Sequence, residues 1–207
     1  MHPPIGPWTI WGLPQDTELR FRKAILLHEL GRLEEAARLY QDILEVREER
    51  HFTSVDRAIA GFKARQNLAV VYRDMGDLDR AEEQWRRIVQ DVPQYRQGWR
   101  GLGDVLLQQC KLENASELAE QLLHDDYLHG EGVLLTARLA ATHGDVEGAR
   151  REVEQLVKNC PDDAEPLRFL SQLLFEHGDP SEALRLYAGN LDATRAIQQI
   201  LQQEADR

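Results

Sequence analysis

The sequence predicts an all-α fold made of repeated helix–turn–helix units. Residues 62–95 contain two stretches with apolar side chains at helical spacing, separated by Gly76–Asp77 and ended by Pro93. The same pattern recurs at intervals of 34 residues, so that units begin at residues 62, 96, 130 and 164 without a slipped residue. A period kept over four copies indicates a solenoid, in which each unit packs against its neighbours.

Each unit carries a small residue at the same place in its second helix. These residues are Ala81, Ala115, Ala149 and Ala183. We expect neighbouring helices to approach too closely at these positions for a larger side chain.

An earlier unit precedes this array. Gly31, Leu33 and Ala36 match the same template if a unit begins at Thr17. That start would place the next unit at residue 51, yet it begins at 62, so residues 51–61 are an insert. We expect the insert to lengthen the following helix backward, with a kink at Gly61.

The two ends of the chain differ from the repeats. Gly189–Asn190 interrupts the second helix of the last unit, and the apolar pattern that follows predicts a capping helix. The predicted divisions are an extended arm over 1–16, repeat 1 over 17–50, the insert over 51–61, repeats 2 to 4 over 62–95, 96–129 and 130–163, repeat 5 over 164–192, and the capping helix over 193–207.

The arm over residues 1–16 combines four prolines with Trp8 and Trp11. Prolines preclude a helix there, while the indoles are too apolar for an idle linker. We expect the arm to pack on the uncovered outer face of repeat 1, or else to contact another domain or subunit. The residues assigned to that outer face are Phe21, Ala24, Ile25 and Leu27.

Cys110 stands where the other first helices are closed by glycine. A left-handed conformation costs a residue with a β-carbon about 1 kcal/mol. We therefore expect a different turn at Cys110 and a lower local stability.

Composition excludes several classes of function. The chain has 25 basic and 36 acidic residues, a net charge of −11, which disfavours binding to nucleic acid. The sequence has no run of 18 apolar residues and no signal-peptide pattern, so we expect no membrane association. Cys110 and Cys160 fall at opposite helix ends, too far apart for a disulfide, which favours a reducing, cytoplasmic location.

No catalytic motif is present in the sequence. Phosphate-binding glycine loops, nucleophile elbows and paired Cys-x2-Cys motifs are missing, so we predict neither an enzyme nor a cofactor. His124, Asp125, Asp126 and His129 could together ligate zinc, but polar residues are ordinary at a helix end and turn. We predict no metal site there.

The order Leu68-Ala69-x2-Tyr72, Gly76-Asp77, Ala81-x3-Trp85 and Pro93 resembles the tetratricopeptide repeat. The resemblance extends over all five units. It implies a right-handed superhelical solenoid of five helix–turn–helix units with a C-terminal capping helix. It also implies a non-catalytic scaffold that binds a protein or peptide, without naming the partner.

The same resemblance indicates a concave binding groove lined by the first helices. The groove positions that we select are Lys63, Asn67, Arg73, Arg100, Asp104, Arg138 and Arg168. Basic side chains suit a partner with acidic or carboxylate groups, and Asn67 stands where family members that grip peptide carboxylates carry an asparagine. The alternative is that Asp104, Glu131 and Glu165 pair with the basic groove residues and so neutralise the row of positive charge, called the basic row.

A narrower resemblance concerns residues 52–89. The run that carries it comprises Phe52, Ser54, Val55, Asp56, Gly61, Lys63, Arg65, Asn67, Leu68 and Ala69. This run is similar to repeat regions on the C-terminal side of bacterial family-two glycosyltransferases. It implies an alternative function, an accessory module that holds an acceptor protein or glycan near a glycosyltransferase catalytic domain absent from this chain.

Overall fold

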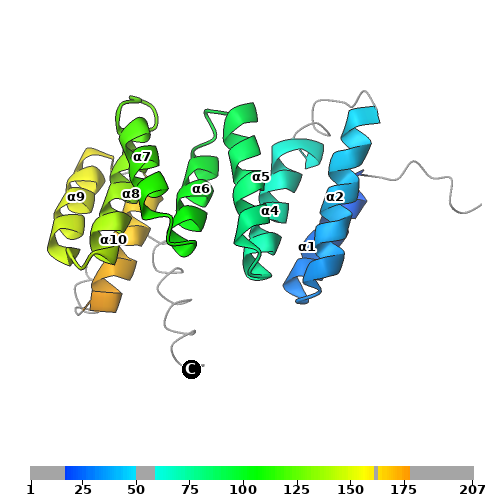
Figure 1. Cartoon of the computed structure of the whole chain (residues 1–207), viewed down its shortest axis with the longest axis horizontal. Coiled ribbons are helices and arrows are strands. Elements are labelled where there is room, and N and C mark those ends of the chain that lie inside the picture. Colours follow the sequence, from blue (N-terminus) through cyan, green and yellow to red (C-terminus); the bar gives the residue numbers. More distant parts are fainter. Residues whose placement is uncertain (1–16, 50–58, 161–162, 178–207) are drawn as a thin grey trace, which may run out of the picture. The chain divides into compact units, whose positions relative to one another are not determined.

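The computed structural model describes residues 17–49, 59–160 and 163–177, and these residues form helices joined by turns (Figure 1). No strand occurs within these ranges, which confirms the predicted all-α fold. The arm over 1–16, the second helix of repeat 5 and the capping helix over 193–207 lie outside the described residues.

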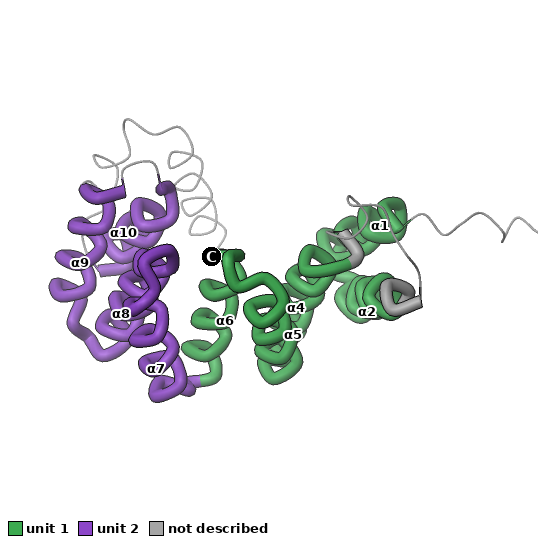
Figure 2. The backbone as a smooth tube through the Cα atoms, turned by 90° about the horizontal axis from the view of Figure 1, so that it is seen from above, with its two compact units in different colours: residues 1–109 green, residues 110–207 purple. Residues whose placement is uncertain are grey.

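The helices follow one another along two compact units. The described elements are α1 (Thr17–Glu29), α2 (Leu33–Glu49), the π-helical turn η1 (Ile59–Lys63), α4 (Ala64–Asp74), α5 (Leu78–Asp91), α6 (Arg96–Gln108), α7 (Leu112–Leu123), α8 (His129–Thr142), α9 (Val146–Asn159) and α10 (Ala164–His177). Residues 1–109 form the N-terminal unit, and residues 110–207 form the C-terminal unit (Figure 2).

Within each unit, consecutive helices pack side by side. In the N-terminal unit α1 packs on α2, α2 on α4, α4 on α5, and α5 on α6. In the C-terminal unit α7 packs on α8, α8 on α9, and α9 on α10. This chain of neighbour contacts is the arrangement expected of repeats, whereas the division into 34-residue repeats itself stays a prediction.

Close helix packing depends on small residues at fixed places. Ala81, Ala115 and Ala149 are fully buried, while Ala183 lies outside the described part of the chain. A β-carbon at Gly98 would lie 2.9 Å from Cγ2 of Ile88 on α5. The first helix of one pair therefore approaches the second helix of the preceding pair closely enough to exclude most side chains.

Four first helices are each followed by a turn residue in the left-handed conformation. Gly31, Gly76 and Gly144 have φ of 71°, 78° and 87°, and Cys110 has φ of 57°. The expectation of a different turn at Cys110 is therefore wrong. The backbone keeps the turn used elsewhere, and the cysteine accepts the left-handed conformation at a cost of about 1 kcal/mol.

Gly61 interrupts the helix that precedes α4. It has φ of −108° and ψ of −122° within η1, and regular α-helix begins at Ala64. A break at Gly61 agrees with the predicted kink. The predicted backward extension of the helix falls on residues 50–58, outside the described ranges.

Helix α1 is apolar on more than one face. Ala24 and Leu27 are buried against the rest of the N-terminal unit, whereas Leu19, Leu26 and Leu30 are 65%, 58% and 72% exposed. Assigning Ala24 and Leu27 to the outer face of repeat 1 was therefore wrong. The outward apolar side chains are the three leucines.

None of the helices in the described ranges combines the length and apolarity needed to span a bilayer.

Candidate binding surface of the first helices

The predicted groove residues fall into two groups, one in each compact unit. Lys63 belongs to η1, Asn67 and Arg73 to α4, Arg100 and Asp104 to α6, Arg138 to α8, and Arg168 to α10. All of them except Lys63 lie on first helices, as the sequence predicted.

Asn67 contributes to the packing of α4 on α2. Its side chain is half-buried and hydrogen-bonds with the buried hydroxyl of Tyr40. Burial raises the pKa of Tyr40 to about 12, although the hydrogen bond with Asn67 opposes part of that rise. Nearby, Nε2 of Gln41 donates to the hydroxyl of Tyr72 over 2.7 Å. Asn67 therefore satisfies a buried polar group between helices, a structural role.

Arg73 is paired with the neighbouring carboxylate. Its Nε and Nη2 donate to Oδ1 of Asp74 over 3.1 and 2.9 Å, and Oδ2 of Asp74 lies 2.7 Å from Nε2 of His28 on α1. Partial burial raises the pKa of Asp74, but the hydrogen bonds from His28 and Arg73 outweigh it and hold the pKa below its ordinary value. This cluster links α1 to α4 and compensates the charge of Arg73.

A mixed polar and aromatic cluster forms where α4 meets α6. We call Phe62, Gln66, Tyr95, Gln97 and Arg100 the Tyr95 cluster. The Tyr95 hydroxyl lies 2.5 Å from Oε1 of Gln66 and 2.7 Å from Oε1 of Gln97, and the Phe62 and Tyr95 rings are 4.9 Å apart between centroids. Partial burial raises the pKa of Tyr95, while the Gln66 hydrogen bond and the charge of Arg100 oppose the rise.

This cluster joins residues that are far apart in sequence. The periodic pattern places Gln66, Gln97 and Arg100 on first helices, but it gives no reason to expect Phe62 and Tyr95 among them. The only signal for these two rings is their position at the predicted junctions between units, with Tyr95 close after Pro93.

In the C-terminal unit, the two predicted arginines have different surroundings. The guanidinium carbon of Arg138 on α8 lies 5.5 Å from the ring centroid of Phe169 on α10, a cation–π contact between two first helices. Arg168 hydrogen-bonds to Glu165, one turn earlier on α10. For Arg168, the structure therefore favours the alternative in which the carboxylates neutralise the basic row.

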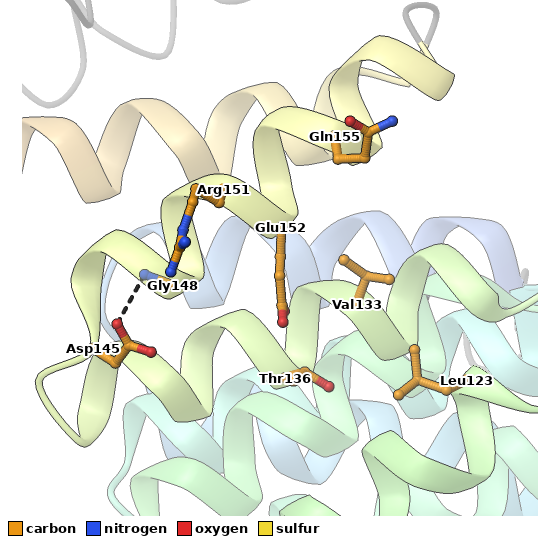
Figure 3. Close-up of a pocket in the computed structure, with 8 residues that line it drawn as sticks. All are labelled: Leu123, Val133, Thr136, Asp145, Gly148, Arg151, Glu152 and Gln155. Atoms are coloured by element: carbon orange, nitrogen blue, oxygen red, sulfur yellow. Dashed lines mark hydrogen bonds between the residues drawn. The ribbon is translucent and has the colours of Figure 1, made fainter.

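A cavity of about 640 Å³ lies on another face of the same unit (Figure 3). Its lining comprises Leu123, Val133, Thr136, Asp145, Gly148, Arg151, Glu152 and Gln155. Val133 and Thr136 lie on the side of α8 away from Arg138, because each residue turns the helix by about 100°. The cavity is thus separate from the predicted groove, and the repeat pattern of the first helices gives no signal for it because half its lining belongs to the second helix α9.

The polar groups of this cavity serve the local backbone. Oδ1 of Asp145 accepts from the Gly148 amide over 2.9 Å and so caps α9 (Figure 3), and Nε of Arg151 donates to the carbonyl of Glu147 over 3.3 Å. These contacts account for Asp145 and Arg151 in the lining by local helix structure.

The residues considered for zinc also make local hydrogen bonds. Nδ1 of His124 donates to the carbonyl of Glu120 over 2.7 Å, and Nδ1 of His129 donates to the carbonyl of Leu123 over 3.0 Å. Oδ1 of Asp125 accepts from the amide of Tyr127. The described residues contain no group of three or more potential ligands arranged to hold a metal ion.

Comparison with known proteins identifies the repeat. One tetratricopeptide repeat family model matches residues 67–126, 111–164 and 134–196, and a second matches residues 23–51. No curated protein sequence matches the chain.

Solved structures with low sequence identity share the fold. A thermophilic TPR protein from Thermus thermophilus is 20% identical with a TM-score of 0.56, covering 89% of this chain and 99% of its own. A putative kinesin light chain with nearly identical TPR-like repeats from Podosopora anserina is 19% identical with a TM-score of 0.53, covering 90% and 96%. The MamA protein is 13% identical with a TM-score of 0.52, covering 88% and 94%. The first family model matches more than half of the residues of this chain, and the chain therefore belongs to the tetratricopeptide repeat family.

Proposed function

We propose that this protein is a non-catalytic scaffold that binds a protein or peptide through the outward faces of its first helices. The family supports the general role, because tetratricopeptide repeats serve as binding scaffolds. The observation that carries the location is the Tyr95 cluster, where two glutamine amides, an arginine and two aromatic rings meet between α4 and α6.

The chemistry of the cluster suits a peptide with a carboxylate. Glutamine amides both donate and accept, so Gln66 and Gln97 can pair with a peptide backbone once Tyr95 shifts its hydrogen bond. Arg100 is half-buried beside them and supplies a guanidinium, the group best matched to a carboxylate. In the C-terminal unit, Arg138 offers the same chemistry over the Phe169 ring.

Three other predicted residues have internal partners in the structure. Asn67 is engaged with Tyr40, Arg73 with Asp74, and Arg168 with Glu165. We assign recognition of an acidic partner to Arg100 in the N-terminal unit, where it belongs to the Tyr95 cluster, and to Arg138 in the C-terminal unit, which lies over the Phe169 ring. The exposed Lys63 on η1 and the half-buried Asp104 on α6 complete the proposed set in the N-terminal unit.

Charge reversal tests the assignment. The probe is a fluorescein-labelled peptide of six glutamates with a free C-terminal carboxylate, and the reference is an amidated hexaglutamine. Arg100→Glu with Arg138→Glu should weaken the fluorescence-anisotropy affinity for the acidic peptide at least tenfold, because repulsion replaces attraction. Added salt should weaken wild-type binding in the same assay.

The matched control reverses two arginines on second helices, Arg86→Glu with Arg151→Glu, which changes the net charge equally. If both double variants lose binding to the same extent, the acidic peptide responds to net charge and the proposed site is wrong. Circular dichroism of each variant establishes that the helices remain folded.

A second candidate function is the accessory module of a bacterial glycosyltransferase. It is supported by the sequence run from Phe52 to Val89, within which Lys63 is exposed and Asn67 is half-buried. A nucleotide-sugar catalytic domain encoded upstream in the same reading frame would favour this candidate. A reading frame without one would argue against it.

A further inference from the structure

Helix α1 presents a row of exposed leucines, which we call the leucine stripe: Leu19, Leu26 and Leu30. Their exposed fractions are 65%, 58% and 72%. Spacings of seven and four residues place them within about 40° of one line along the helix. The exposed Lys23 separates Leu19 from Leu26 on this face. Large apolar side chains gathered on one surface mark a contact site more often than do scattered ones.

At two of the three stripe positions, those of Leu19 and Leu26, the equivalent residues of later first helices are buried, whereas the residues equivalent to Leu30 are half-buried or exposed. The left-handed turn residues Gly31, Gly76, Cys110 and Gly144 fix the register. Twelve residues before them stand Leu19, Ala64, Gly98 and Gly132, and five residues before them stand Leu26, Val71, Val105 and Leu139. Beyond α1, all members of both sets are buried.

In the later pairs, this face packs against the preceding second helix. A β-carbon at Gly98 would meet Ile88 of α5 at 2.9 Å, and one at Gly132 would meet the backbone nitrogen of Leu123 on α7 at 2.7 Å. Leu19 and Leu26 are therefore the counterparts of residues in an established helix contact. No described helix lies before α1 to make it.

The side chain at the first stripe position indicates what covers the stripe. Alanine and glycine at Ala64, Gly98 and Gly132 let a helix approach closely, whereas Leu19 holds a helix away. An extended segment is narrower than a helix and can lie between the leucines. The occupant should therefore be extended and apolar.

We propose that residues 5–13 of this chain lie in extended conformation along the leucine stripe and cap the first helix pair. This segment contains Ile5, Trp8, Ile10, Trp11 and Leu13, and its prolines disfavour a helix. Nine extended residues span about 30 Å, while the stripe is about 17 Å long. Residues 14–16 remain to reverse the chain before Thr17.

The test uses the full chain labelled with 5-fluorotryptophan, whose ¹⁹F resonances are assigned with Trp8→Phe and Trp11→Phe. Leu26→Asp should move the Trp8 and Trp11 resonances to solvent-exposed positions and leave that of the buried Trp85 in place. The same change should lower the melting temperature by about 2–4 °C, as expected for loss of a small docked segment in a chain of this size.

Tyr127→Asp is the matched control, because Tyr127 is also a large exposed apolar residue, 62% accessible, but lies in the C-terminal unit. It should leave the Trp8 and Trp11 resonances unchanged. Solvent-exposed Trp8 and Trp11 signals in the wild type, unaffected by Leu26→Asp, would overturn the proposal. Light scattering that shows a dimer dissociated by Leu26→Asp, with those two resonances unchanged, would overturn it in favour of a second copy on the stripe.

Discussion

At the scale of single residues, Cys110 shows how the fold overrides a local preference. Its φ of 57° matches the three glycines at the equivalent turns, so the chain tolerates a β-carbon in a left-handed conformation. We expect Cys110→Gly to raise the free energy of unfolding by about 0.5–1 kcal/mol, because relief of the left-handed cost exceeds the added entropy of the unfolded glycine. Urea unfolding followed by circular dichroism measures this.

Gly144→Ala is the reciprocal control. Gly144 has φ of 87°, and a β-carbon there would meet no atom within 4 Å, so the substitution isolates the backbone cost. It should lower the free energy of unfolding by a similar amount. An unchanged stability in both variants would show that these turns relax without cost.

At the scale of helices, the His28–Asp74–Arg73 cluster makes the packing of α1 on α4 depend on pH. Because the folded state holds the pKa of Asp74 below its ordinary value, its carboxylate stabilises the fold at pH values above about 4. That contribution disappears as pH falls through the lower, folded-state pKa. We expect the stability difference between wild type and Asp74→Asn to be present at pH 6 and to shrink as the pH falls below about 4, the ordinary pKa of an aspartate.

Thermal melts of wild type and Asp74→Asn across this range measure the effect. Asp91→Asn is the control, since Asp91 is exposed at the end of α5. A difference between wild type and Asp74→Asn that stays constant with pH would mean that the loss came from packing and not from the carboxylate charge.

At the scale of the whole molecule, the contacts between neighbouring helices predict that a substitution in one helix destabilises that helix and its neighbours and leaves distant helices unchanged. Ala115 on α7 is fully buried, so Ala115→Arg should overpack the contact and cost about 1–3 kcal/mol or more. Hydrogen exchange should accelerate in α7 and in α8, which packs on it, while amides of α1 and α2 keep their protection. Exposed Ser116→Arg, one residue further on, should leave all of these helices unaffected. Equal acceleration of hydrogen exchange in all helices would contradict a solenoid in which each helix is stabilised by its immediate neighbours.

The sequence predicts the helices well because the period fixes them. Apolar spacing, turn glycines and small contact residues recur in step. Helices α6 and α10 begin at residues 96 and 164, α8 begins at 129, one residue before the predicted unit start, and α4 begins at 64, two residues after it. The sequence was less informative where the same apolar spacing fits two orientations of a helix. Helix α1 is apolar on more than one face, and periodicity alone did not show that Ala24 turns inward and Leu26 outward.

The sequence predicts which helices carry the candidate site residues, but it does not predict which side chains pair with them. The repeat register puts Asn67, Arg73 and Arg168 on first helices, yet it does not show that each has a partner in Tyr40, Asp74 or Glu165. Such pairs depend on side-chain rotamers and on helices brought together by folding. The Tyr95 cluster has the same origin, since its rings lie at junctions that the periodic pattern does not describe.

The contact between α2 and α4 also bears on how such chains change in length over evolution. Tyr40 with Asn67, and Gln41 with Tyr72, join residues on opposite sides of the insert at 51–61, so side chains and not chain length fix how the two helices meet. A homologue with a different number of residues before Ile59 could therefore keep the same contact between α2 and α4, because the side chains that form it lie outside the insert.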